Sequence, residues 1–216
     1  MHGKRHLLRA VLAAALASPA AYAQAPSQGS GATIIQSPAS PPGAPARPQT
    51  ARPTLVPQPG DPSNVDEVVL PERDVLVLSG SSTWEDGLKN VRAAIGRIEV
   101  ELAKAGVDPA GRPLCVFTNT ADDDFRFDAM VPVARSPDPG VVLPEGMRWA
   151  KTPSGKAYRF AHKAAYEEID QTYETITTYL DAKDIVAKDA FIEEYVNDVT
   201  DPADTALEVN IYVQPK

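Results

Sequence analysis

The chain ends in the stretch Leu207-Glu208-Val209-Asn210-Ile211-Tyr212-Val213-Gln214-Pro215-Lys216, in which apolar and polar side chains alternate. Successive side chains of a β-strand point to opposite faces of the sheet. Val209, Ile211 and Val213 therefore share an apolar face. Glu208, Asn210 and Tyr212 share a polar face. This alternation predicts a closing strand of an antiparallel sheet. Its polar face is a candidate floor for a groove, and a plain solvated surface is the alternative.

Two helical stripes precede this strand. In each stripe, apolar side chains recur at steps of three and four, as on the face of an α-helix that packs against a core. The first stripe comprises Trp84, Leu88, Val91, Ile95, Ile98 and Leu102, and the second comprises Tyr166, Ile169, Tyr173, Ile176 and Leu180. We expect Gly106 to end the first helix, because glycine readily adopts the left-handed conformation that follows a helix.

The folded part of the chain uses one plan twice. Expected strands flank the two helices at residues 75–78, 114–118, 125–133, 157–162, 191–196 and 208–213. Each half, 72–135 and 150–216, is then a strand, a helix and two strands, related by an offset of 82 residues. Neither half can bury its helix alone, so we predict an α+β fold: one antiparallel sheet with both helices on one face. The opposite face is expected to form a central ligand cleft.

The N-terminus has the features of an export signal. Three basic residues precede position 10, an alanine-rich apolar run covers 7–16, and residues 21–23 have the small-x-small pattern of a cleavage site. These features predict a signal peptide over 1–23, cleaved after Ala23. The apolar run is too short to span a bilayer. We therefore expect a periplasmic protein with no stable membrane insertion after cleavage.

A proline-rich segment follows the signal peptide. Residues 24–64 hold ten of the 21 prolines and few large apolar side chains. Such a segment cannot bury enough surface to offset the entropy of ordering, so it is predicted to be a disordered linker. The folded domain is then expected at residues 65–216, a common size for a single domain.

Composition excludes several kinds of site. The 29 acidic residues all lie beyond residue 60, and loss of the signal peptide takes the formal charge from −8 to −11, which disfavours nucleic-acid binding. Cys115 is the only cysteine and lies in an apolar run, so it is expected to be buried and unpaired. Two of the three histidines lie within the signal peptide, which excludes a histidine- or cysteine-rich metal site. We expect neither a metal nor an organic cofactor.

The candidate ligand-binding residues come from the polar sides of the expected strands and from the helix starts. They are Trp84, Asp128, Met130, Tyr166, Glu193, Tyr195, Glu208, Asn210 and Tyr212. Aromatic walls around a carboxylate suit a flat cation, because ring faces and the carboxylate both attract positive charge. Glu193 and Glu208 are the candidate catalytic residues, since burial would raise the pKa of either carboxyl. Core packing for Trp84 and Tyr166, and simple surface roles for the two glutamates, are the alternatives.

Four segments resemble the signatures of a known family. The stretch His162-Lys163-Ala164-Ala165-Tyr166 and its continuation to Tyr173 resemble the His-x-Gly-Pro-Tyr signature of the GyrI-like domain. Residues 193–198 are similar to its Glu-x-Tyr-x-x-Asp segment, residues 210–213 to its closing strand, and residues 127–133 to the matching strand of the first half. The similarity spans about 72–216. This domain is also the effector-binding domain of AraC- and MerR-type regulators, and it is related in fold to SOUL haem-binding proteins.

The resemblance implies two strand-helix-strand-strand units around a cleft that binds small amphipathic, often cationic or aromatic molecules. Some stand-alone members resemble hydrolases, and others resemble sequestering proteins. Two positions depart from the pattern: Ala164-Ala165 replaces Gly-Pro, and Asn210 stands where the family has a buried glutamate, with Glu208 two residues earlier on the same face. An amide cannot neutralise a cation or act as a general base.

These observations predict an exported protein that holds a hydrophobic small molecule, either a neutral amphiphile or a cation, between two pseudo-repeats. One alternative is a cofactor-independent hydrolase of small electrophilic compounds that uses a cleft glutamate. Another is an envelope interaction module without a ligand, tethered by its proline-rich arm. Exposed sheet edges would also allow two copies to pair as a homodimer.

Overall fold

The computed structural model describes residues 52–120, 124–135, 142–198 and 201–216. The predicted signal peptide and residues 24–51 of the predicted linker lie outside the described residues. No helix in the described ranges combines the length and the apolar content needed to cross a bilayer.

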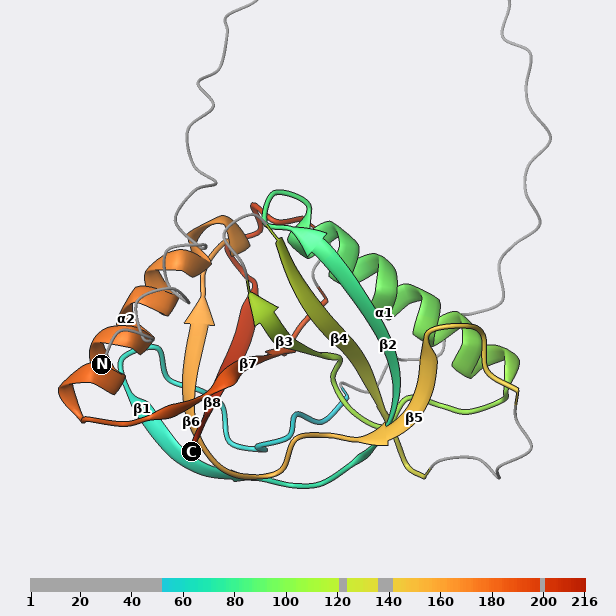
Figure 1. Ribbon diagram of the computed structural model, residues 1–216, viewed down its shortest axis with the longest axis horizontal. Coiled ribbons are helices and arrows are strands. Elements are labelled where there is room, and N and C mark those ends of the chain that lie inside the picture. Colours follow the sequence, from blue (N-terminus) through green and yellow to red (C-terminus); the bar gives the residue numbers. More distant parts are fainter. Residues whose placement is uncertain (1–51, 121–123, 136–141, 199–200) are drawn as a thin grey trace, which may run out of the picture. The chain divides into compact units, whose positions relative to one another are not determined.

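The described residues form one antiparallel sheet with helices on one face (Figure 1). In chain order, the first elements are β1 (Val65–Leu70), β2 (Asp74–Thr83), α1 (Gly87–Lys104), β3 (Leu114–Thr120) and β4 (Asp124–Val133). They are followed by β5 (Met147–Lys151), β6 (Gly155–Lys163), the 3₁₀ turn η1 (Tyr166–Glu168), α2 (Ile169–Ala182), β7 (Ala187–Tyr195) and β8 (Glu208–Pro215). The predicted α+β class is confirmed.

The strand order, β1-β6-β8-β7-β3-β4-β2-β5, confirms the predicted duplication. β2, α1, β3 and β4 form one unit, and β6, α2, β7 and β8 form the other. The two units join where β3 pairs with β7, and this pairing places Cys115 directly opposite Glu193. The strands β1 and β5 were not predicted. They are edge strands, each bonded on one side only, and neither has a sustained apolar alternation that would mark it in the sequence.

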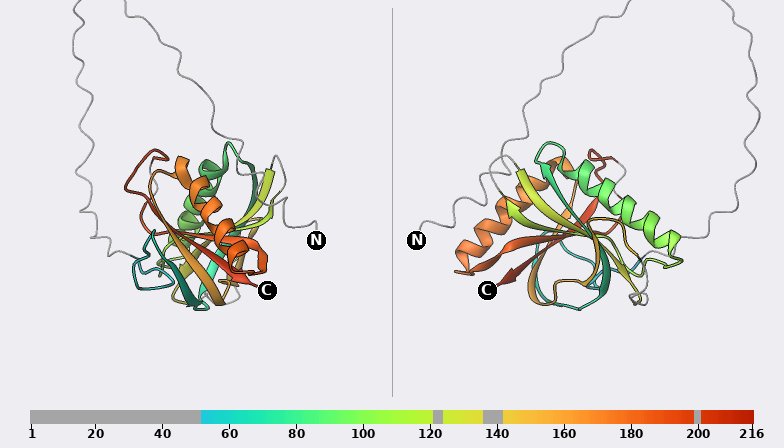
Figure 2. Two further views of the ribbon diagram at one scale, coloured as in Figure 1. Left: turned by 90° about the vertical axis from the view of Figure 1, so that its left-hand side faces the viewer. Right: turned by 45° about the vertical axis from the view of Figure 1, so that its right-hand side comes forward.

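The helices begin slightly later than their apolar stripes. α1 starts at Gly87, after a turn in which the Gly87 amide donates to the Trp84 carbonyl at 3.3 Å. It ends at Lys104, and the predicted stop residue Gly106 follows the cap Ala105 with a left-handed φ of +66°. In the second half, η1 carries Tyr166 and leads directly into α2. The helices lie over different units, since α1 packs on β2 and β4 while α2 packs on β6 (Figures 1 and 2).

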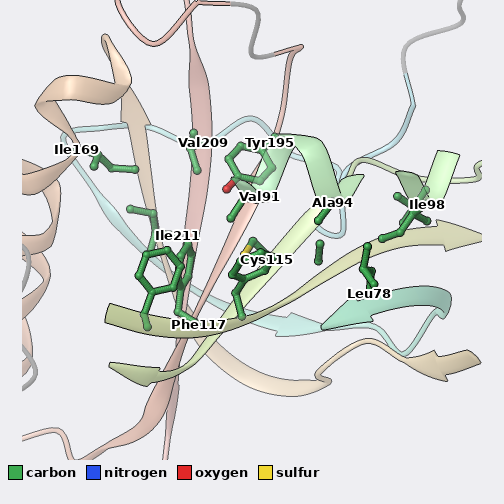
Figure 3. Packing of buried hydrophobic residues seen from close by; sticks show 14 of the residues in the cluster. Leu78, Val91, Ala94, Ile98, Cys115, Phe117, Ile169, Tyr195, Val209 and Ile211 are labelled. Carbon is green, nitrogen blue, oxygen red and sulfur yellow. The ribbon is translucent and has the colours of Figure 1, made fainter. Parts of the chain in front are cut away.

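Apolar side chains fill both faces of the sheet. The larger cluster lies between the sheet and the helices, and Figure 3 shows part of it, including Val91 from α1, Cys115 from β3 and Val209 from β8. The residues Val209, Ile211 and Val213 belong to this cluster, so the predicted alternation of the last strand is confirmed. A second cluster lies on the face away from the helices, which we call the outer face.

The outer face is covered by residues 52–60, which we call the strap. Leu55 and Val56 in the strap are only 6% and 8% exposed, and they pack in the second cluster. Figure 1 shows the strap (cyan) running across the sheet toward β1. The strap lies within the range predicted to be a disordered linker, but two adjacent aliphatic residues between prolines give it an apolar anchor on the sheet.

Candidate functional site

A buried carboxylate lies on the helix-facing side of the sheet. Glu193 on β7 is 1% exposed, and it accepts hydrogen bonds from three tyrosine hydroxyls. The Tyr173 hydroxyl donates to Oε1 at 2.7 Å, and the hydroxyls of Tyr166 and Tyr195 donate to Oε2 at 2.9 and 3.0 Å. We call Glu193 and these three tyrosines the Glu193 cluster.

Three different elements position the Glu193 cluster. Tyr195 is two residues from Glu193 on β7 and therefore points to the same face. Tyr173 comes from the inward face of α2, and Tyr166 comes from η1, just before that helix. Tyr173 and Tyr195 are buried, whereas Tyr166 is half-buried. Tyr166 is therefore the tyrosine of the cluster that reaches the surface.

Burial controls the protonation of this cluster. Removal from water raises the pKa of Glu193, and the three hydrogen bonds from the tyrosines oppose that shift. Burial and the neighbouring carboxylate raise the pKa values of the three hydroxyls well above their usual range. The hydroxyls therefore stay protonated and act as donors. Among the described residues, the partners of Glu193 are neutral hydroxyls and include no basic side chain.

A second buried carboxylate lies directly behind the first, on the outer face. Glu194 is fully buried and accepts hydrogen bonds from the Tyr212 hydroxyl at 2.6 Å and from the Asn210 amide at 3.0 Å. Its third partner is the backbone amide of Leu55 in the strap, at 2.6 Å. Burial raises the pKa of Glu194, and these hydrogen bonds oppose the shift.

The structure therefore divides the predicted site residues between two faces. Glu193, Tyr195 and Tyr166 come together on the helix side, while Asn210 and Tyr212 lie on the outer face around Glu194. The prediction that one outer groove would hold all of these residues is wrong about Glu193, Tyr195 and Tyr166. Tyr166 is on the helix side because η1 leads directly into α2. For Glu193 and Tyr195, the reason is that the central residues of β7 are buried on both faces, so no polar alternation indicates which side each one occupies.

The other predicted residues are divided between the same two faces. Trp84 is half-buried and packs against the helix-side cluster, with its ring centroid 4.6 Å from that of Phe125. Met130 packs in the outer-face cluster beneath the strap. Asp128 lies near the surface, where the Arg148 guanidinium donates to it at 2.7 Å.

Glu208, the second candidate catalytic residue, is the first residue of β8, which lies between β6 and β7. Its side chain is 39% exposed and pairs with the ammonium of Lys163 at 3.4 Å. In the described part of the domain, the buried carboxylates lie on β7 and not on the last strand, where the family resemblance placed one. Glu193 is therefore the stronger of the two candidates for an acid/base or counter-charge role.

Sequence reasoning missed two members of these clusters. Tyr173 lies in the apolar stripe of its helix and in the family signature, but it is not among the predicted ligand-binding residues, although a buried hydroxyl in such a stripe needs a partner. Glu194 is also absent from the predicted residues. The signal that could have identified it is the pair of adjacent acids in Phe191-Ile192-Glu193-Glu194-Tyr195, where strand neighbours must point to opposite faces.

Two pseudo-repeats that enclose a carboxylate beneath their helices define a duplicated α+β domain with a central polar site. The chain belongs to the GyrI-like small molecule binding domain family, because the family model matches residues 63–216. A comparison with curated proteins finds no match.

Several solved structures share this fold. The EcmrR–DNA complex matches with a TM-score of 0.58 and 15% identity, over 71% of this chain and 58% of that one. The EcmrR C-terminal domain matches with a TM-score of 0.58 and 14% identity, over 70% of this chain and 96% of that one. SAV2435 bound to tetraphenylphosphonium matches with a TM-score of 0.49 and 12% identity, over 71% of this chain and 94% of that one. The chain thus spans 58% of the EcmrR chain in the DNA complex. At 14–15% identity, the two EcmrR matches show a shared fold and nothing further.

Proposed function

We propose that this protein binds a hydrophobic, cationic small molecule on the helix side of the sheet, with Glu193 as the counter-charge. The observation that carries the proposal is a buried carboxylate whose described partners are three neutral hydroxyls. An ionised carboxylate in the interior is costly unless a positive charge compensates it. A bound cation would supply that charge, and the tyrosine rings would add cation–π attraction.

The surroundings of Glu193 fit the apolar part of such a ligand. Val91, Phe117 and Ile169 belong to the same cluster and come from α1, β3 and α2 (Figure 3). In the structure, the tyrosines themselves occupy the space at the carboxylate. Ligand entry therefore requires one of them to turn aside, and the half-buried Tyr166 is the tyrosine we assign to this movement.

Hydrolysis is the second candidate function, and one observation favours it. The raised pKa of Glu193 and the three hydroxyls within 3.0 Å are features of general acid/base sites. In this role Glu193 would activate a water molecule toward an electrophilic ligand. A hydrolase must also bind its substrate, so binding and hydrolysis would use the same site. The two functions differ in whether the ligand is recovered unchanged.

We also propose that the protein works in the periplasm, on the basis of the export signal in residues 1–23. Expression in a Gram-negative host, followed by mass spectrometry of the periplasmic fraction, tests this. A mature chain that begins at Gln24 is the expected product. An intact N-terminus in the cytoplasm would contradict it.

The binding proposal is tested by thermal unfolding against a panel of lipophilic cations and neutral amphiphiles. A ligand at about 100 times its dissociation constant stabilises a protein by roughly 2.7 kcal/mol. We expect cations to raise the melting temperature of the wild type, and Glu193→Gln to abolish that shift. The matched control is Glu208→Gln, which removes a half-exposed acid and should retain the shift. Mass analysis of the recovered ligand then separates binding from hydrolysis.

A further inference from the structure

The outer face holds the strap by its main chain. Glu194 accepts the backbone N–H of Leu55 at 2.6 Å. Arg159, which is 3% exposed, donates to the backbone carbonyls of Gln58 and Pro59 at 2.5 and 3.3 Å. Both side chains are buried, so these bonds replace part of the hydration that they lose. Asp66 on β1 supplies the ion pair of Arg159, and Tyr212 and Asn210 supply the side-chain donors of Glu194.

The N-terminal end of the strap is held in the same way. The backbone amide of Arg112 donates to the carbonyl of Pro53 at 3.0 Å, and its guanidinium donates to the carbonyl of Arg52 at 3.2 Å. Arg52 also forms an ion pair with Glu99 on α1. The domain therefore binds backbone groups at both ends of the strap and in its middle.

Two side chains supply the apolar part of the contact. Leu55 and Val56 pack with a floor that includes Val77, Val116 and Ile192. The residues around them are prolines at 53, 57 and 59, which restrict the chain to extended conformations. The strap thus combines a short apolar anchor, a stiff proline-flanked backbone and hydrogen bonds to backbone groups. Peptide-binding domains commonly recognise their ligands in this way.

The strap lies outside the residues that the family model matches. The family model begins at residue 63, whereas the strap covers 52–60. The surface beneath the strap, which includes Glu194, Tyr212, Arg159 and Arg112, is thus covered by a segment that precedes the matched domain.

From these contacts we infer that the outer face is a peptide-binding groove, distinct from the Glu193 cluster, and that the strap occupies it in cis. The partner that fits the groove in trans is an extended peptide with two adjacent aliphatic residues flanked by prolines. The strap is joined to β1 by residues 61–64 only, so its effective concentration at the groove is of millimolar order. A free peptide therefore binds well only when the strap is weakened or displaced. This inference does not depend on the proposed cation site.

The test uses the full chain and a fluorescein-labelled peptide of residues 52–60. In the double variant Leu55→Ser, Val56→Ser, the strap loses its anchor while the groove stays unchanged. We expect the peptide to bind this variant at least about 100-fold more tightly than it binds the wild type, because the tethered strap competes in the wild type. A peptide carrying the same two serines is the matched control and should bind neither chain. Fluorescence polarisation measures each affinity.

Two results would overturn the inference: no binding of the peptide to the double variant, or equal binding to both chains. If circular dichroism shows that the double variant does not fold, a second design applies. A protease site is inserted between Gly60 and Asp61 of the otherwise wild-type chain, which is purified and then cut. Native mass spectrometry should show the cut N-terminal fragment still bound and replaced by excess labelled peptide. Immediate loss of the fragment, or failure of the peptide to replace it, would again contradict the inference.

Discussion

Glu193 and Glu194 are consecutive residues of β7 whose carboxylates are both buried, on opposite sides of the sheet. Glu193 faces the helices and is bound by three tyrosine hydroxyls, while Glu194 faces the strap and is bound by one tyrosine, one asparagine and one backbone amide. One strand thus carries the central charge of the proposed ligand site and the central charge of the strap contact. Each carboxylate can be changed to glutamine separately, which allows the two faces to be tested independently.

Loss of a hydroxyl from the Glu193 cluster should destabilise the protein. Tyr173→Phe removes the donor at 2.7 Å and leaves the buried carboxylate with two donors. We expect the free energy of unfolding to fall by about 1–3 kcal/mol, the usual cost of leaving a buried polar group without a partner. Urea unfolding measures the change. Tyr179→Phe, on the same helix but outside the cluster, is the control, and an equal loss in both variants would contradict the assigned role of the Tyr173 hydroxyl.

The stability of the protein should depend on pH through Glu193. Burial raises its pKa, so the folded chain binds this proton up to a higher pH than the unfolded chain does. The protonated form of Glu193 therefore contributes fully to the free energy of unfolding below the pKa of the carboxyl in the unfolded chain, about 4.3. This contribution is lost as the pH rises toward the higher pKa of the folded chain, at no more than about 1.4 kcal/mol per pH unit. Glu193→Gln cannot titrate and should not show this decrease in stability.

Denaturant unfolding of the wild type and Glu193→Gln, between pH 4 and 8, checks this prediction. The difference in unfolding free energy between the two chains should shift in favour of the variant as pH increases. Glu208→Gln controls for the removal of a half-exposed acid. Parallel curves for the wild type and Glu193→Gln would show that Glu193 does not titrate differently on folding.

The strap should contribute measurably to stability. Leu55→Ala removes most of a buried side chain from the outer-face cluster, and such truncations cost about 2–5 kcal/mol. Val69→Ala on β1 is the matched control, because Val69 is 71% exposed and its truncation should change stability by less than about 0.5 kcal/mol. Thermal unfolding of the wild type and both variants measures these changes in stability. If Leu55→Ala unfolds like the wild type, the strap does not stabilise the domain.

Periodicity predicted most of the fold. The apolar stripes of Val91 and Ile176 placed both helices, and the alternation in 208–213 placed the closing strand with the correct faces. The site was only partly predictable. In β7, Ile192, Glu193, Glu194 and Tyr195 are all buried, and a strand enclosed on both faces shows no polar alternation. The sequence marks Glu193 as a candidate, but the face of the sheet that its side chain occupies follows from the strand pairing. The packing of the strap on the other face was not predicted, because its proline-rich composition is typical of disordered linkers.

The most direct test of the central claim is a calorimetric titration of tetraphenylphosphonium, a lipophilic cation, at pH 8. Wild type, Glu193→Gln and Glu194→Gln are compared, since the last removes an equally buried acid from the other side of the same strand. The account predicts binding to the wild type and to Glu194→Gln, and at least a tenfold weaker affinity for Glu193→Gln, a difference of about 1.4 kcal/mol. Equal affinity for the wild type and Glu193→Gln, or no binding by any folded chain, would contradict the claim that Glu193 is the counter-charge for a cationic ligand.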